Sequence, residues 1–333
     1  MRFKIVHKLI FVLSGLLVLT SCQPKSKLEG IWIGAYKIDH TESDSVIMTN
    51  RYLLDIEKEE LTVKVFDYPM SGRIGLTERF KYILTKDSLK TVSDTFLIKS
   101  LNTDSLVLNH TINNKRDLVF KRLLQDKTSP NVELTNKAFV IKYPHYTDSI
   151  DFINDSLFME IDRSFRTTRW SISNYKGFKF LIIDKIAYPL YLIHSCSEHE
   201  VNLKRFANVV MDYKMTEIEC KMDTCGLIGK WICPINDSIP LPPVPLWGLL
   251  DADPKESLII EKDSIKISQF GRTEVKKWEL NSTNELIYFP ECNSRESKVW
   301  RIVQLSKIKL KLERNSKTHI KTDNEVIEFI RNE

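Results

Sequence analysis

The sequence of 333 residues lacks the motifs that mark the common enzyme classes. It has no Gly-x-Ser-x-Gly, no His-Glu-x-x-His, no phosphate-binding glycine loop and no dinucleotide glycine run, so nothing in it favours a hydrolase, a metalloprotease or a nucleotide-binding enzyme. It also lacks a Cys-x-x-Cys pair, the usual motif of redox and zinc sites. Its acidic side chains are too scattered to suggest an acid and base pair, so we expect a protein that is not an enzyme and needs no cofactor.

Glycine, proline and excess charge are also scarce. The chain has 10 glycines and 12 prolines, too few for a low-complexity protein, and its 42% hydrophobic content is typical of a globular one. The formal net charge is +5, and it falls to +2 without residues 1–21, because Arg2, Lys4 and Lys8 lie there. Binding to nucleic acid requires a stronger basic footprint, so we expect no nucleic acid partner.

A long hydrophobic run is missing as well, although a short one lies near the start. Leu9–Leu19 follows basic residues and would span about 16 Å as a helix, half of a hydrocarbon core of about 30 Å, so it is too short to cross a membrane. A cleavage site of small residues that ends in cysteine follows the apolar run, Leu19-Thr20-Ser21-Cys22. This order of parts predicts a secretory signal in residues 1–21 that is removed just before Cys22.

The segment Leu19–Cys22 resembles the lipobox of bacterial lipoproteins. The resemblance implies that Cys22 carries lipid and holds the chain to a membrane, because two or more acyl chains anchor a protein stably. Residues 22–27 are polar and would form a short lipidated tether. Gln23 stands where an aspartate tends to retain lipoproteins at the inner membrane. The resemblance therefore implies the bacterial cell envelope, at an outer membrane and facing the periplasm.

The remaining chain shows the hydrophobic pattern of β-strands. Leu61, Val63 and Val65 alternate with polar residues, and the run Ile308, Leu310 and Leu312 alternates with lysines. A period of two turns one face of a strand toward a core and the other toward water, which is typical of antiparallel sheets. Long stretches with a period of 3.6 residues are absent, so the sequence predicts an all-β protein.

Two strand starts are alike, Leu28-Glu29-Gly30-Ile31-Trp32 and Leu227-Ile228-Gly229-Lys230-Trp231, and similar strands follow each in the same order. The middle of the chain fits this order less well and has no Gly-x-Trp start. We therefore predict three tandem units of small antiparallel barrels or meanders, at residues 28–127, 128–224 (a degenerate unit) and 225–333. The alternative is that any two β-meanders look similar at this level of detail.

The two Gly-x-Trp starts, Gly30-x-Trp32 and Gly229-x-Trp231, resemble those of small lipocalin-like lipoprotein domains. In that family the glycine lets the chain approach the barrel floor, and the tryptophan packs across the closed end beneath a basic residue of the last strand. Arg122 closes the first unit in Phe120-Lys121-Arg122, and Arg331 closes the last. The resemblance thus implies lipocalin-like barrels in which Trp32, Arg122, Trp231 and Arg331 have structural roles, whether the barrels are open or filled.

One cluster contains side chains that bind metals, His194-Ser195-Cys196-Ser197-Glu198-His199-Glu200. On a regular strand, His194, Cys196 and Glu198 would share one face and could bind zinc or copper. A cysteine and histidine nucleophile pair is a weaker alternative, because no third group is in view to orient it. The simplest interpretation is the end of a strand and its hairpin turn, where the repeat places residues 303–307 in the last unit.

A second feature is the run Pro240-Leu241-Pro242-Pro243-Val244-Pro245-Leu246-Trp247-Gly248. Its four prolines favour an extended course that would present Leu246 and Trp247 on an otherwise polar connection. The segment could be a rigid lid or a docking surface for a partner. Alternatively, the loop packs its own tryptophan onto the barrel.

These observations leave three hypotheses for function. The first is a membrane-anchored interaction or scaffold protein of the envelope, built from β-barrel units and touching other envelope proteins. The second is a binding protein for a small apolar ligand or an envelope component. The third is a metal-binding protein or enzyme that uses the His194 cluster. An apolar cavity would favour the second, and exposed apolar patches would favour the first.

Overall fold

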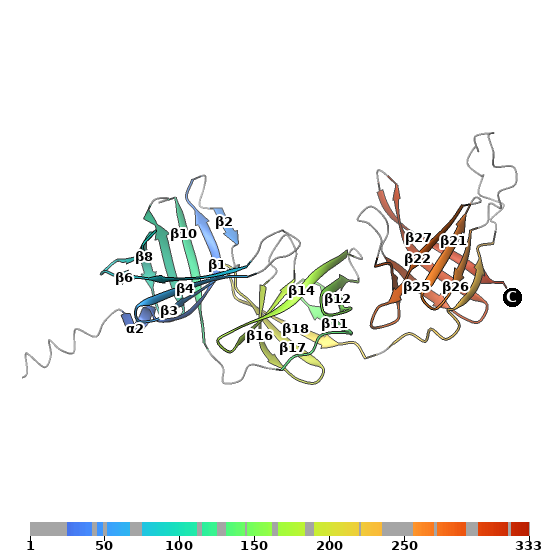
Figure 1. The fold of residues 1–333 in the computed structure, drawn as a ribbon, viewed down its shortest axis with the longest axis horizontal. Coiled ribbons are helices and arrows are strands. Elements are labelled where there is room, and N and C mark those ends of the chain that lie inside the picture. Colours follow the sequence, from blue (N-terminus) through green and yellow to red (C-terminus); the bar gives the residue numbers. More distant parts are fainter. Residues whose placement is uncertain are drawn as a thin grey trace, which may run out of the picture. The chain divides into compact units, whose positions relative to one another are not determined.

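The computed structural model describes residues 25–41, 45–48, 52–66, 75–111, 115–124, 131–143, 145–161, 166–183, 190–219, 221–234, 256–269, 272–290, 299–318 and 321–332. After one helical turn, α2 (Lys25–Leu28), these residues form strands in three successive groups (Figure 1). The predicted all-β fold of barrel units is confirmed. Over the described ranges, no helix is long and apolar enough to cross a membrane. The predicted signal sequence and Cys22 lie outside them, as do Leu246 and Trp247.

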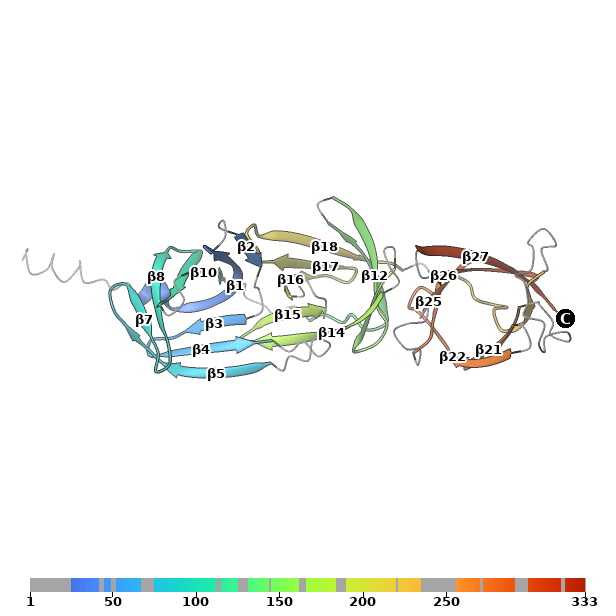
Figure 2. The same cartoon turned by 90° about the horizontal axis from the view of Figure 1, so that it is seen from above.

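The first group is a ten-stranded antiparallel sheet with the order β5-β4-β3-β1-β10-β9-β8-β7-β6, while β2 pairs with β1 from outside this path. Figure 2 shows β3, β4 and β5 running side by side. The strands are β1 (Gly30–Asp39), β2 (Ser45–Met48), β3 (Tyr52–Ile56), β4 (Glu60–Val65), β5 (Leu76–Lys81), β6 (Ile83–Leu84), β7 (Ser88–Lys90), β8 (Thr95–Leu101), β9 (Ser105–His110) and β10 (Arg116–Leu123).

This sheet nearly closes into a barrel, which we call the first barrel, because its two end strands are consecutive in the chain. Only Tyr82 separates β5 from β6, so the two are halves of one bent strand that pairs with β4 on one side and β7 on the other. The Tyr82 hydroxyl donates a hydrogen bond of 2.6 Å to the Glu57 carbonyl in the turn after β3. When β5 and β6 are counted as one strand, the nine strands of the path make an eight-stranded barrel. Side chains can fill the interior of a barrel of this size, or the interior can hold one small ligand.

The second group is a closed eight-stranded barrel, in which the last strand pairs with the first. It forms although the segment has no Gly-x-Trp start. Its strands are β11 (Lys137–Lys142), β12 (Thr147–Phe152), β13 (Leu157–Glu160), β14 (Arg166–Tyr175), β15 (Phe178–Ile183), β16 (Leu190–Cys196), β17 (Glu200–Arg205) and β18 (Met211–Glu217).

The third group, which we call the third barrel, repeats the order of the first in β22-β21-β20-β19-β27-β26-β25-β24-β23. Here Trp278 alone separates β22 from β23, and its ring Nε1 donates to the Glu261 carbonyl at 2.9 Å. Tyr82 makes the corresponding bond to the Glu57 carbonyl in the first barrel. The strands are β19 (Gly229–Ile232), β20 (Ser257–Ile260), β21 (Ser264–Gln269), β22 (Arg272–Lys277), β23 (Glu279–Leu280), β24 (Leu286–Tyr288), β25 (Val299–Leu305), β26 (Lys309–Thr318) and β27 (Lys321–Arg331).

The three groups share one irregularity. A register shift interrupts the pairing of β8 with β9, of β16 with β17 and of β25 with β26, in each case after the first two residue pairs of the hairpin that precedes the last strand. The expected alternation also has an exception here. Leu310 and Leu312 are fully buried in β26, but Ile308 lies in the turn before that strand and is 69% exposed, so the prediction that it shares their face is wrong.

Contacts divide the chain into two compact units. One combines the first barrel with Arg169–Ser197 and Val201–Tyr213 of the middle barrel, and the other combines the third barrel with Val132–Thr168 and Lys214 onward. Within the first unit, the Tyr175 hydroxyl donates to Asp55 at 2.7 Å, beside a shared apolar cluster. Within the second, the buried Asp151 carboxylate accepts hydrogen bonds from Asn281 and Ser282. In each unit an outer barrel is thus joined to strands of the middle barrel by both apolar and polar contacts.

Candidate functional site

The first barrel is closed at one end by a tryptophan beneath an arginine. Trp32 on β1 is fully buried, and its Nε1 donates to the Leu28 carbonyl at 2.8 Å. The Arg122 guanidinium on β10 lies 4.1 Å from the centroid of the Trp32 ring and donates to the backbone carbonyls of Glu29, at 2.7 Å, and Lys27. One cation thus stacks on the ring and ties the chain that enters β1 to the last strand.

Gly30 makes this close approach possible. Its φ is +138°, a conformation that L side chains rarely adopt, and a Cβ on it would lie 2.7 Å from Arg122 Nη1. The floor of the first barrel therefore depends on the glycine, the tryptophan and the arginine together.

The third barrel has the same floor. Trp231 is fully buried, its Nε1 donates to the Leu227 carbonyl at 2.9 Å, and Arg331 lies 5.1 Å from the ring centroid. Gly229 has a φ of +154°, and a Cβ there would lie 2.6 Å from Arg331 Nη2. The two Gly-x-Trp motifs therefore build the same arrangement. Arg122 lies over the Trp32 ring in the first barrel, and Arg331 lies over the Trp231 ring in the third.

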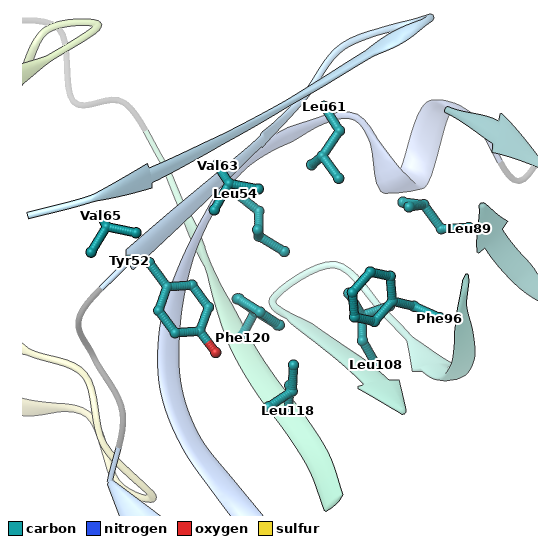
Figure 3. A pocket seen from close by; sticks show the side chains of 10 residues that line it. All are labelled: Tyr52, Leu54, Leu61, Val63, Val65, Leu89, Phe96, Leu108, Leu118 and Phe120. Carbon is teal, nitrogen blue, oxygen red and sulfur yellow. The ribbon is translucent and has the colours of Figure 1, made fainter. Parts of the chain in front are cut away.

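Above the floor, the first barrel contains a partly open cavity of about 240 Å³. Leu54, which pairs with Trp32 across β1 and β3, belongs to its wall, so the cavity begins directly over the closed end. Side chains from six strands surround it (Figure 3): Tyr52, Leu54, Leu61, Val63, Val65, Leu89, Phe96, Leu108, Leu118 and Phe120.

Nearly the whole wall is apolar. Among the ten lining side chains only Tyr52 carries a polar atom, its hydroxyl, and its ring meets the Phe120 ring edge-on at 5.7 Å. At the end of β9, His110 Nε2 lies 2.8 Å from Oδ1 of Asp94, the residue just before β8, and the His110 ring packs edge-on against Phe96 at 5.2 Å. The hydrogen bond from His110 lowers the pKa of Asp94, helped by one from Ser93, so this charged residue already has partners of its own.

The matching positions of the third barrel hold different side chains. Leu258 pairs with Trp231 as Leu54 pairs with Trp32. Two residues before each leucine, Glu256 therefore occupies the place of Tyr52. Arg314 pairs with Trp300 as His110 pairs with Phe96, so it occupies the place of His110.

Glu256 and Arg314 form an ion pair inside the third barrel, with 2.6 Å between Oε1 and Nη1. The guanidinium lies 4.4 Å from the Trp300 ring centroid and 5.3 Å from that of Phe329, and Phe289 meets Trp300 edge-on at 4.7 Å. Glu256, Trp300 and Phe329 occupy positions that match the cavity-lining residues Tyr52, Phe96 and Phe120 of the first barrel. The two barrels therefore share a floor and differ in their interiors.

The structure does not bring His194, Cys196 and Glu198 together as a metal site. The register shift in β16 falls between Ile193 and Ser195, so His194 is the extra residue there, and Glu198 lies beyond the end of the strand. Within the described residues, no group of three or more His, Cys, Asp or Glu side chains could hold a metal ion. The expected common face assumed an unbroken period of two, which the shift interrupts.

The sequence pattern did not identify the cavity residues, Tyr52 and Phe96 among them. Buried apolar positions occur in all three barrels, so their pattern alone does not distinguish a cavity from a filled core. The usable signal lay in the differences between the repeats, Tyr52 against Glu256 and His110 against Arg314. Reading it requires the strand register.

Fold and site together define a class: an all-β protein of three barrels or nearly closed sheets, the first of which contains a partly open apolar cavity. No protein-family model matches the sequence, and no curated protein matches it.

Among solved structures, a lipocalin-like protein from Bacteroides uniformis is 14% identical with a TM-score of 0.25, over 29% of this chain and 99% of that one. An uncharacterized protein from Bacteroides eggerthii is 12% identical with a TM-score of 0.24, over 28% of this chain and 98% of that one. Transferrin binding protein B from serogroup B Neisseria meningitidis is 10% identical with a TM-score of 0.18, over 84% of this chain and 65% of that one.

Proposed function

We propose that this protein is a non-catalytic lipoprotein of the bacterial cell envelope whose first barrel binds a small apolar ligand. The observation that supports this proposal is the cavity of about 240 Å³ above the Trp32 floor, with its apolar wall. A concave, mostly apolar space with few polar groups is typical of small-molecule sites. Water gains little in such a space because it finds too few hydrogen-bond partners, so an apolar occupant is favoured.

The volume limits the size of the ligand. An apolar cavity of roughly 150 Å³ accommodates benzene, so about 240 Å³ suits a molecule with roughly ten non-hydrogen atoms, such as a fused pair of aromatic rings. The wall contains no carboxylate, imidazole, thiol or amine, so it offers binding rather than chemistry.

The anchoring part of the proposal rests on Cys22. Only the residues 23–26 separate it from Lys27, whose carbonyl Arg122 holds, and five chain steps reach at most about 18 Å. Lipid on Cys22 would therefore hold the closed floor of the first barrel near the bilayer. In fractionated cells, the wild-type chain is expected in membranes and the Cys22→Ser variant in the soluble fraction. A membrane-bound Cys22→Ser variant would refute the anchor.

The interaction or scaffold role has a separate basis in the third barrel. At the matching positions it carries the Glu256–Arg314 pair and the rings of Trp300, Phe289 and Phe329, so a charged and aromatic cluster stands there in place of an apolar wall. We therefore assign ligand binding to the first barrel and a structural or partner-contacting role to the third.

Ligand binding can be tested with naphthalene fluorescence on residues 23–333 purified without lipid. We expect saturable binding that a Val63→Trp substitution abolishes, because Val63 lines the cavity and the larger ring would occupy it. The matched control is Ile267→Trp, since Ile267 pairs with Leu258 in the third barrel as Val63 pairs with Leu54 in the first. Binding that survives Val63→Trp, or that Ile267→Trp abolishes equally, would contradict the assignment.

A further inference from the structure

We infer that the ligand of the first barrel enters and leaves through the end of the barrel opposite its floor, so that it is exchanged with the surrounding water and not with the bilayer that holds the protein. This inference rests on the proposed binding and anchoring functions and adds the side from which the ligand arrives. The ligand is then a small apolar molecule that dissolves as a monomer in water, and not a lipid drawn out of the anchoring bilayer.

The floor blocks the end of the barrel that is nearest to Cys22. Trp32 and Leu28 are both fully buried there, and a hydrogen bond of 2.8 Å joins Trp32 Nε1 to the Leu28 carbonyl. The Arg122 guanidinium stacks on the ring at 4.1 Å and also holds the Glu29 carbonyl. A ligand that passed this way would have to displace a buried indole together with the cation stacked on it, so the floor acts as a plug.

The opposite end of the cavity is more exposed. On β3, Leu54 beside the floor is buried, whereas Tyr52, two residues farther from the floor, is partly exposed. On β10, Phe120 is buried and Leu118, two residues farther away, is partly exposed. Val65, which pairs with Tyr52, is partly exposed as well. The partly exposed wall residues at this end form the mouth of the cavity: Tyr52, Val65, Phe96 and Leu118.

Charged side chains lie just beyond the mouth. Next to Phe96, His110 and Asp94 are 2.8 Å apart, and their side chains are 26% and 38% exposed. Where β1 and β10 leave the cavity, Arg116 Nε donates to the Asp39 carboxylate at 2.7 Å. Paired charges of this kind are typical of a surface in contact with water, because charged groups are rarely buried without cost. The apolar wall therefore opens toward water at this end.

The predicted tether attaches at the plugged end. Cys22 lies at most about 18 Å from Lys27 along an extended chain, and the Lys27 carbonyl is bound by Arg122 of the floor. Leu118 precedes Arg122 by four residues on β10, so at a rise of about 3.4 Å per residue the mouth lies about 14 Å farther along the barrel. Lipid on Cys22 would hold the floor toward the bilayer and leave the mouth in the water.

Stopped-flow fluorescence of naphthalene release tests the inference. Residues 23–333 in solution and the lipidated full chain in phosphatidylcholine vesicles are each loaded with naphthalene and mixed with acceptor vesicles that carry a brominated-lipid quencher. Release through water should have a rate constant that does not depend on acceptor concentration and that agrees within about twofold between the two preparations. A rate that rises in proportion to the acceptor vesicles, or that is at least about tenfold faster for the lipidated chain, would overturn the inference.

A substitution at the mouth gives a second readout. Leu118→Trp should slow release at least about fivefold in both preparations, because the larger ring narrows the mouth. The matched control is Ile327→Trp, since Ile327 pairs with Leu312 in the third barrel as Leu118 pairs with Leu108 in the first, and it should leave the release rate unchanged. Release from Leu118→Trp as fast as from the wild type would overturn the inference and leave the proposed function standing. If residues 23–333 do not bind naphthalene, or the full chain carries no lipid, the proposed function itself fails.

Discussion

The first and third barrels have the same strand order, the same Gly-x-Trp floor and different interiors. In both, a buried tryptophan lies beneath an arginine of the last strand, and an aromatic residue marks the bend that closes the barrel. Nearer the other end, Tyr52 and His110 of the first barrel become Glu256 and Arg314 in the third. The comparison shows that one floor arrangement is compatible with two different sets of inward side chains beyond it.

The largest expected effect comes from removing the floor tryptophans. Trp32→Ala and Trp231→Ala should each lower the free energy of unfolding by about 3–5 kcal/mol, because each deletes a fully buried ring and the stacked cation's partner. Chemical denaturation of each variant measures the loss. If the two floors are equivalent, the two losses of stability will agree within about 1 kcal/mol. A clearly larger loss in one variant would contradict the equivalence of the floors.

The next effect separates the two interiors. Glu256→Gln should destabilise the protein by about 3 kcal/mol, because it leaves the charge of Arg314 buried without its counter-ion. Tyr52→Phe, at the matching position, should cost less than about 1.5 kcal/mol, because it removes one neutral hydroxyl. Denaturant titrations of both variants provide the measurement. Equal costs would mean that the ion pair does not distinguish the third barrel from the first.

The floor glycines should give a smaller, matched pair of effects. Gly30→Ala and Gly229→Ala should each cost about 1–3 kcal/mol, because both residues have positive φ and a Cβ would meet the arginine that covers the tryptophan. Thermal unfolding of the two variants provides the measurement. Variants as stable as the wild type would show that the arginine can move away without a loss of stability. The floor would then not require the glycine.

The smallest effect concerns pH at the hollow barrel. His110→Phe should raise the pKa of Asp94 toward its ordinary value, because the hydrogen bond from His110 is the main cause that lowers it. A carboxyl whose folded pKa is lowered contributes stability that is present above its unfolded pKa of about 3.9 and lost as pH falls through the folded value. The variant should therefore lose this acid-side dependence. Carboxyl NMR titration follows Asp94, with His199→Phe as the control, and an unmoved Asp94 pKa would contradict the assignment.

Much of the fold could be predicted from the pattern of residues. The alternation of Leu61, Val63 and Val65 identified β4, because a period of two is visible without knowing what a strand pairs with. The same rule failed at Ile308 and around His194, where a turn and a register shift interrupt the strand. Irregularities of this kind depend on the neighbouring strand, and a single strand's sequence does not show them.

The sequence by itself determined that the protein is all-β, that its first and last parts begin with the same Gly-x-Trp motif, and that its basic and acidic residues are nearly balanced. Only the tertiary structure showed that the first barrel has an apolar cavity. That outcome depends on side chains from six strands that meet across a register, so Tyr52 and Glu256 become comparable only once their strands are paired. Local periodicity indicates which way a side chain faces. Packing across the barrel determines whether the space that the side chain faces is filled.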